Sequence, residues 1–266
     1  MYRWQRHSLA VLRIWLQDGL AYSASGVIWV LTEVVTSGFM PFVWAAAAAG
    51  GMIRGFSISN LTMYYVAMMV CSCFITCHFM WEVAYEIREG LFTTNLVRPT
   101  SYLQFMFMRN LAWRIIRTCL FIPFFCLLPI VYSGLVSSFH LYFTPQVLLC
   151  MLLGHTLSFM SVMALAMIAL VVTEAQALFE LYYVPMLFLS GQLFPLSLLP
   201  HWTAALARFT PFYYTTGLPA EIMIGRVSHE DAWPLIGIQC IWILLCYGAF
   251  KVLWRYGLRN YTGVGM

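Results

Sequence analysis

One stretch decides how this chain folds: residues 81–117, WEVAYEIREGLFTTNLVRPTSYLQFMFMRNLAWRIIR. It carries eight charged residues, in a chain that has only 14 Lys and Arg and 10 Asp and Glu. They are Glu82, Glu86, Arg88, Glu89, Arg98, Arg109, Arg114 and Arg117. Apolar runs flank the stretch on both sides. Because a charged side chain at the centre of a bilayer costs about 2.5 to 3.5 kcal/mol on insertion scales, we expect the stretch to lie in water or against a partner, as the cytoplasmic platform of a membrane protein.

The composition is typical of an integral membrane protein. Hydrophobic residues make up 62% of the chain and the mean hydropathy is +0.81, whereas soluble domains are about 45 to 50% apolar. Six spans of about 20 residues with short connections would use nearly all of the chain. We therefore expect an all-α fold with six transmembrane helices in a single membrane domain, residues 1–266, and no separate soluble domain.

Charge and cysteine content argue against two other classes of protein. The net charge of +4 is spread over the chain ends and loops, so we expect no nucleic-acid partner. The eight cysteines all fall inside apolar runs and none has the CxxC spacing. This pattern favours buried thiols over disulfides, and we assign no metal ligands.

The first 20 residues are predicted to form an amphipathic helix at the membrane interface. Basic and acidic residues alternate with an apolar face made of Trp4, Val11, Leu12, Trp15 and Leu16. A signal peptide is the alternative interpretation. Arg13 and Asp18 interrupt what would be its apolar core, so we expect the segment to remain in the mature protein.

The six spans are predicted at about 23–49, 61–81, 115–135, 145–172, from 177 onward, and 232–250. With a cytoplasmic N-terminus, eleven basic residues lie inside and three outside. This bias places both termini and the segment 82–110 in the cytoplasm, in a multi-pass protein of the inner cell membrane.

The segment 189–231 has a different pattern. Its first part, LSGQLFPLSLLPHWTAALARFTPFYYTTGLPAEIMIG (189–225), contains short apolar pieces separated by prolines, and no piece is long enough to span a bilayer. We expect re-entrant or interfacial helices at the outer face, shielded by protein. The alternative is an outer loop that lies on the bilayer.

Within the charged stretch, helical spacing puts Glu82, Glu86 and Glu89 on one face. Val83, Ile87 and Leu91 lie roughly opposite. This predicts a short amphipathic helix that continues from the second span, with a break permitted at Gly90 and an end at Arg98-Pro99. Such a helix is a candidate docking element for another protein. The alternative is a solvated helix at the lipid head groups.

The chain has no sequence signature of an enzyme. Its only lysine is Lys251, so a GxxxxGK[ST] phosphate-binding loop is impossible, and GxSxG and HExxH are missing. Any ATPase that drives it must be a separate polypeptide. The ionisable residues inside predicted spans are Glu33, His78, His155 and Glu180. Such residues are candidates for substrate contact or proton transfer, or they pair with polar groups on neighbouring helices.

Three features together resemble the permease subunits of ABC-2-type exporters, in the six-helix group that works with a separate ATPase. The first is the amphipathic N-terminal helix before the first span. The second is EIREGLFTTNLVRPTSYLQF (86–105), with its Gly90, Leu96, Arg98 and Pro99. The third is the outer segment, with Ser190, Gly191, Phe194 and Pro195, followed by Pro211, Tyr214, Pro219 and Gly225.

The resemblance implies that the cytoplasmic helix inserts into a cleft on an ABC ATPase subunit, which binds Mg-ATP, while this chain holds no cofactor. It implies a coupling segment made of Glu82, Glu86, Ile87, Arg88, Glu89, Gly90, Leu91, Arg98 and Pro99. It also implies a translocation pathway or outer gate that includes Glu33, Gly191, Gln192, Phe194 and Pro195. The remaining partners would be membrane lipid and a second permease, either identical or related.

An amphipathic small molecule, drug or lipid-like compound is the expected cargo. Two other functions remain open from the sequence. One is an ion- or proton-coupled carrier that uses Glu33 or Glu180. The other is a structural or assembly subunit that transports nothing.

Overall fold

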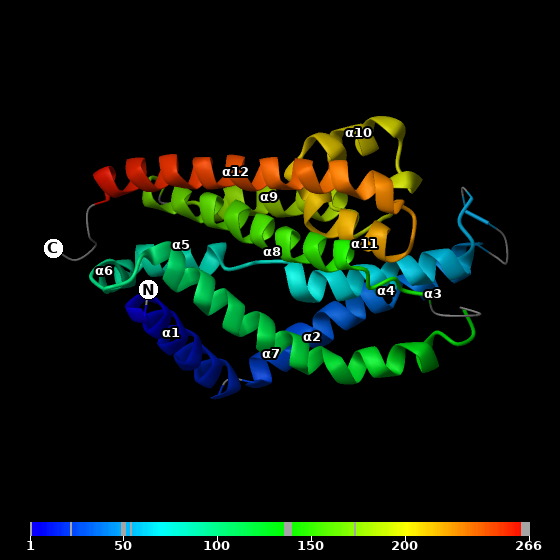
Figure 1. The fold of residues 1–266 in the computed structure, drawn as a ribbon, viewed down its shortest axis with the longest axis horizontal. Coiled ribbons are helices and arrows are strands. Elements are labelled where there is room, and N and C mark those ends of the chain that lie inside the picture. Colours follow the sequence, from blue (N-terminus) through cyan, green and yellow to red (C-terminus); the bar gives the residue numbers. More distant parts are fainter. Residues whose placement is uncertain are drawn as a thin grey trace.

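The computed structural model describes residues 2–21, 23–48, 52–53, 55–135, 140–172 and 174–261. Over these ranges the fold is helical and contains no β-strand, which confirms the all-α prediction (Figure 1). The long helices are α1 (Tyr2–Ala21), α2 (Ser23–Gly38), α4 (Ile58–Ile75), α7 (Tyr102–Val131), α8 (Pro145–Ala166), α9 (Gln176–Leu189) and α12 (His229–Asn260). The short ones are α3 (Met40–Ala48), α5 (Met80–Arg88), α6 (Leu91–Leu96), η1 (Met167–Leu170), η2 (Leu196–Leu198), α10 (His201–Phe209), η3 (Tyr213–Gly217) and α11 (Leu218–Met223).

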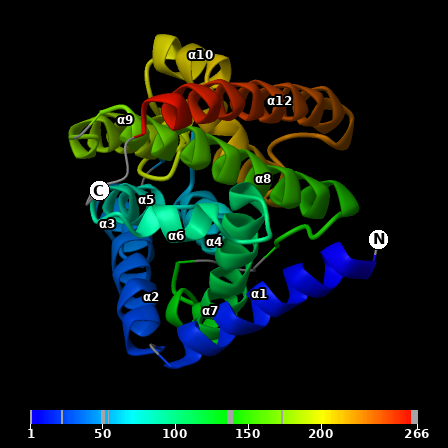
Figure 2. The same cartoon turned by 90° about the vertical axis from the view of Figure 1, so that its left-hand side faces the viewer.

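The helices form layers. α8 and α12 pack along each other, α4 and α5 lie between this pair and α7, and α1 and α2 pack on α7 from the other side (Figures 1 and 2). The N-terminal end of α1, the corner between α5 and α6, and the C-terminal end of α12 all lie at one end of the molecule (Figure 1). The segment predicted to be cytoplasmic therefore shares one end with the start of α1 and the end of α12.

Four of the described helical segments are long and apolar enough to cross a membrane: Ile58–Arg88, Tyr102–Val131, Pro145–Leu170 and His229–Asn260. The chain is thus a multi-pass membrane protein in its architecture. The other two predicted spans are shorter. The first is divided into α2 and α3 at Phe39, because Pro41 suits the first turn of a new helix better than a helix interior. The fifth, α9, has 14 residues.

The second predicted span was wrong in one respect: it is not a continuous helix into the charged stretch. α4 ends at Ile75, α5 begins at Met80, and Thr76–Phe79 is unwound. Side chains of other helices bind the freed backbone groups. The Cys77 N–H donates to Ser158 Oγ at 3.0 Å, and Arg114 Nη1 donates to the Cys73 carbonyl at 3.1 Å. Such a break is tolerated at membrane depth only where protein satisfies the backbone in this way.

The charged stretch was predicted to lie in water or against a partner, but part of it is buried inside this chain. α7 begins at Tyr102, where the Ser101 hydroxyl caps it by accepting from the Gln104 N–H, and it continues into the predicted third span. Arg114 and Arg117 lie on this helix and are only 2% and 6% exposed. Their burial was missed because the number of charges in a stretch does not show which face of α7 carries them.

The N-terminal helix is confirmed as α1, but it packs on α7. The Trp15 ring meets Phe105 edge to face, with 6.0 Å between centroids, while Ile14 and Leu20 on the other side are exposed. Its location at a membrane interface stays a prediction. The segment 189–231 consists of short helices separated by prolines, as predicted.

Candidate functional site

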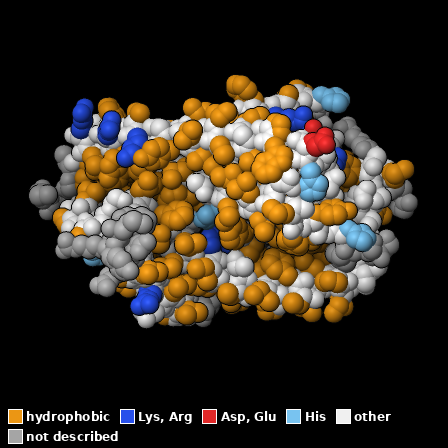
Figure 3. All heavy atoms as spheres, viewed as in Figure 1, with side chains coloured by type: hydrophobic (Ala, Val, Ile, Leu, Met, Phe, Trp, Pro, Cys, Tyr) orange, Lys and Arg blue, Asp and Glu red, His pale blue; other side chains and the backbone are white. Residues whose placement is uncertain are grey.

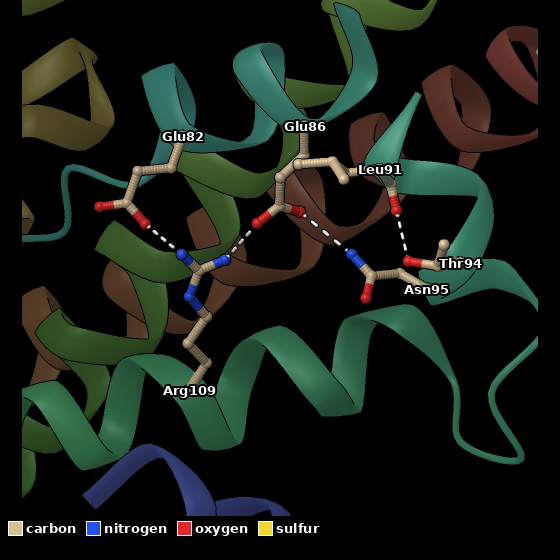
Figure 4. A network of polar contacts seen from close by, with 6 residues as sticks. All are labelled: Glu82, Glu86, Leu91, Thr94, Asn95 and Arg109. Carbon is tan, nitrogen blue, oxygen red and sulfur yellow. Dashed lines mark hydrogen bonds and ion pairs between the residues drawn. The ribbon is translucent and has the colours of Figure 1, made fainter. Parts of the chain in front are cut away.

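An ion cluster joins four helices at the end of the molecule where α5 meets α6 (Figure 4). Arg109 of α7 donates from Nη2 to Glu82 and from Nη1 to Glu86, both at 2.6 Å. The second Glu86 oxygen accepts from Asn95 of α6 at 3.1 Å. The Arg109 guanidinium also lies 4.4 Å from the centroid of the Trp15 ring of α1. We call the group Glu82, Glu86, Asn95 and Arg109 the Arg109 clamp.

The local sequence explains this geometry. Glu82 and Glu86 are four residues apart and so share one side of α5, where the planar fork of an arginine can reach both carboxylates. Gly90 then adopts φ of +75°, a left-handed conformation that glycine accepts without strain, and turns the chain back into α6. This turn is what brings Asn95 within reach of Glu86.

The clamp divides the predicted coupling segment into an inner and an outer side. Glu86 is 15% exposed in its side chain, and Ile87 is buried in the core. Outward lie Tyr85, Arg88, Glu89, Leu91, Val97, Arg98 and Pro99, which we call the docking face. It combines exposed apolar side chains with both signs of charge. Of the three glutamates predicted on one face, Glu82 and Glu86 bind Arg109, and Glu89 lies beside Arg88 at 3.4 Å.

A cavity of about 680 Å³ lies directly behind the clamp. Its walls come from α1, α5, α7, α9 and the break between α4 and α5. The lining residues are Trp15, Asp18, Gly19, His78, Phe79, Trp81, Glu82, Met106, Arg109, Asn110, Trp113, Arg114, Arg117, Glu180 and Tyr183. Glu82 and Arg109 are shared, so the clamp forms one wall of the cavity. Figure 3 shows basic and histidine side chains set back among hydrophobic ones on one face of the molecule. The volume is in the usual range for small-molecule sites.

A buried polar network connects the helix break to α7 and α8. Asn110 Nδ2 lies 3.3 Å from both Cys77 Sγ and His155 Nε2, and His155 Nδ1 lies 3.3 Å from the Ile75 carbonyl oxygen. Thus His155, a candidate for transport chemistry from the sequence, has both ring nitrogens engaged with neighbouring groups. Its position in this network makes it a structural support of the break.

At the other end of the molecule the predicted gate residues hold the segment 189–231 against α4. The Gly191 carbonyl accepts from the Tyr64 hydroxyl at 2.7 Å, and the Leu193 carbonyl accepts from Tyr65 at 2.8 Å. Gln192 donates to the Thr216 hydroxyl at 3.3 Å. The Phe194 ring lies on Trp44 of α3, with centroids 6.2 Å apart, and Pro195 directly precedes η2.

A buried tyrosine stabilises the same segment. Tyr213 donates to Glu221 at 2.7 Å. Burial, with the nearby Glu221 carboxylate, raises the pKa of Tyr213 well above its usual range, so the phenol stays protonated as a donor.

The remaining ionisable residues of the predicted spans, Glu33, Glu180 and His78, lie outside both the clamp and the outer segment. The Glu33 side chain lies outside the described residues, on α2. Glu180 is exposed and lines the cavity together with His78. Arg109, Asn110 and Arg114 carry the site but were not chosen from the sequence. Spacing gave a signal for two of them, because Asn110 and Arg114 are four residues apart and so share one side of a helix.

Comparison with protein-family models matches residues 34–265 to the ABC-2 family transporter protein model. No curated protein and no solved structure matches the chain. The family match includes the break between α4 and α5, the clamp residues on α5, α6 and α7, and the whole segment 189–231. Because the match covers most of the chain, this protein belongs to the ABC-2 transporter family.

Proposed function

We propose that this chain is the membrane-spanning subunit of an ATP-driven exporter of a small amphipathic compound, a drug or a lipid-like molecule. The family supports the coarser statement directly: its members are membrane permeases of ABC transporters, generally without catalysis, and they work with an ABC ATPase. In this proposal the partner ATPase binds Mg-ATP, and six helical segments cross the inner membrane with both termini in the cytoplasm. The shorter spans are then α2 with α3, and α9.

The single observation that carries the proposal is the Arg109 clamp. It connects the docking face on α5 and α6 to the wall of the cavity through ion pairs of 2.6 Å. A force applied to α5 by an ATPase therefore acts on a side chain that also faces the cavity. One guanidinium that donates charge-assisted hydrogen bonds to two carboxylates makes a strong and directional contact. A contact of this kind can transmit movement between helices.

The other end of the molecule suits a gate. In this proposal α10, η3 and α11 are re-entrant or interfacial helices at the outer face, and Gly191, Gln192, Phe194 and Pro195 hold them closed against α3 and α4. Two tyrosines of α4 donate hydrogen bonds to backbone carbonyls of the segment 189–231, and a modest shift of α4 would release both. The aromatic contact of Phe194 is with Trp44 of α3. Because α4 precedes α5 in the chain, movement at the docking face can reach the gate.

We further propose that two permeases, identical or related, act together in lipid. Much of the surface of α7 and α12 is apolar and exposed, including Ile130 and Leu244. Lipid and a second permease are the partners that such faces accept. A carrier that uses Glu33 or Glu180 alone would need neither the docking face nor an ATPase.

The test is association with a candidate ABC ATPase from the same organism, coexpressed with this chain. The Arg88→Glu/Glu89→Arg variant inverts two of the three charges of the docking face, keeps Arg98, and leaves the clamp intact. We expect it to lower the amount of ATPase that copurifies by about tenfold, because like charges then meet at the interface. The matched control is Glu230→Arg, an exposed change at the opposite end of the molecule. If equal amounts of ATPase copurify with wild type, with Arg88→Glu/Glu89→Arg and with Glu230→Arg, the docking face is not the ATPase-binding surface.

A further inference from the structure

The cavity behind the Arg109 clamp contains a buried arginine with hydrogen-bonding capacity left over. Arg114 is 2% exposed and lines the cavity. Its Nη1 donates to the Cys73 carbonyl, while its buried Nε has no hydrogen-bond partner. None of the described carboxylates lies within ion-pair distance of Arg114. A full positive charge thus lies within a candidate membrane span against a neutral carbonyl.

The acidic residues of the cavity do not neutralise this charge. Glu82 is bound to Arg109, and its side chain is 58% exposed. Asp18 and Glu180 are also exposed. The acids therefore lie toward solvent, and the buried basic residues that line the cavity are Arg114 and Arg117. An anion that enters would pass the solvated acids and bind where water is scarce and charge is least screened.

Other groups beside Arg114 extend the site. Asn110 and His78 provide polar atoms on the walls, from α7 and from the helix break. Most of the remaining lining is aromatic, including Trp15, Trp81 and Trp113. One side of the cavity can hold a charged group, and the rest can hold an apolar body.

Arg114 also has a structural role, since it satisfies the carbonyl freed by the break after α4. That role uses one of the five N–H donors of a guanidinium. A neutral donor such as glutamine would serve the same carbonyl without the cost of a buried charge. The charge itself is therefore what remains to be explained, and a bound anion explains it.

We propose that this cavity binds the anionic head group of an amphiphile, a carboxylate or a phosphate, with Arg114 as its main contact and the apolar body against Trp81 and Trp113. As a statement about cargo class, this rests on the proposed transport function. As a statement about binding, it concerns this chain alone and can be tested without an ATPase.

The test is quenching of tryptophan fluorescence by a brominated amphiphile, with the full chain in phosphatidylcholine nanodiscs. The probe is 12-bromododecanoate. The reference is 12-bromododecan-1-ol, which enters the same bilayer without a charge. We expect saturable quenching with the carboxylate alone, and an apparent affinity about tenfold weaker in Arg114→Gln, because a charge-assisted hydrogen bond is lost. Arg255→Gln, the matched loss of an exposed arginine, should bind as wild type does.

A second measurement leaves Arg114 in place, in case its variant does not fold. Trp81→Phe/Trp113→Phe should remove the saturable quenching, whereas Trp202→Phe/Trp233→Phe, which changes two exposed tryptophans, should retain it. Equal quenching by the alcohol, or saturable quenching that survives the loss of Trp81 and Trp113, would overturn the proposal. If carboxylate binding fails this test while the ATPase still associates normally, the proposed cargo class is wrong, but the proposed transport function stands.

Mass spectrometry of lipid extracted from the purified protein distinguishes two sources of the head group. Anionic phospholipid retained by wild type and lost in Arg114→Lys or Arg114→Gln identifies a membrane lipid that needs the guanidinium fork. Saturable bromododecanoate binding without retained phospholipid identifies a soluble amphiphile. If the folded wild-type protein neither retains phospholipid nor binds bromododecanoate saturably, the proposed site is contradicted.

Discussion

Arg109 is the residue on which the arrangement of α1, α5, α6 and α7 depends most. It binds two carboxylates and lies on the face of Trp15. We predict that Arg109→Gln lowers the free energy of unfolding by roughly 1.5 to 3 kcal/mol, because Glu86 is left partly buried without its charged partner. Arg109→Lys should recover only part of this, since an ammonium cannot serve both carboxylates as a fork does.

Unfolding of the purified protein in mild detergent, followed by tryptophan fluorescence, measures these differences. Glu89→Gln is the control, because the pair that Glu89 forms with Arg88 is solvent-exposed and such pairs contribute about 0 to 1 kcal/mol. If Arg109→Gln unfolds as wild type does, the clamp is not a structural connection.

Residue by residue, the sequence predicted which stretch matters but not the partners within it. Glu82 and Glu86 were assigned to an outward acidic face, yet their carboxylates bind Arg109, which lies more than twenty positions along the chain. Helical periodicity shows which residues share a side of one helix, whereas it does not show which other helix covers that side. Arg114 was expected in water or against a partner, and its burial was missed for the same reason.

At the scale of elements, the segment 189–231 depends on Gly191 where it leaves α9. Gly191 has φ of +84°, and a Cβ there would collide with the Tyr64 hydroxyl. We predict that Gly191→Ala lowers the free energy of unfolding by about 1 to 3 kcal/mol through backbone strain alone, and by more because the hydrogen bond from Tyr64 is disturbed. Thermal unfolding in detergent measures the effect.

Gly237→Ala is the matched control for this prediction. Gly237 lies inside α12, and a Cβ there meets nothing within 4 Å. Alanine favours a helix interior by about 0.5 to 1 kcal/mol over glycine. The control should therefore be neutral or more stable than wild type. Equal stability of the two variants would show that Tyr64 does not hold this segment.

Elements with a strong local signal were predicted well. The N-terminal helix, the fourth span, the turn at Gly90 and the short helices after α9 all follow from apolar runs, glycine and proline. The break at Thr76–Phe79 had no such signal, because it contains neither glycine nor proline. It exists because Ser158, His155 and Arg114, on other helices, satisfy its backbone, and tertiary partners of this kind are not visible in one segment of sequence.

For the whole molecule, the three sites to which we propose functions are separated along one axis. The docking face lies at the end where α1 begins and α12 ends, the cavity lies behind it, and the segment 189–231 lies toward the other end. α4 and α5 extend between these regions and are joined by an unwound segment. Two rigid helices with a break between them can change their relative angle, which is what coupling of a docking site to a distant gate requires.

The most direct test of this mechanism measures MgATP hydrolysis, in nanodiscs, by an ABC ATPase that copurifies with this chain. Three samples are compared: the ATPase alone, the ATPase with wild-type chain, and the ATPase with Arg88→Glu/Glu89→Arg. We predict that wild-type chain changes the hydrolysis rate severalfold and that the docking-face variant returns it to the rate of the ATPase alone, because coupling between the two subunits is reciprocal. A hydrolysis rate that is the same in all three samples would contradict the assignment of this chain as the permease of that ATPase.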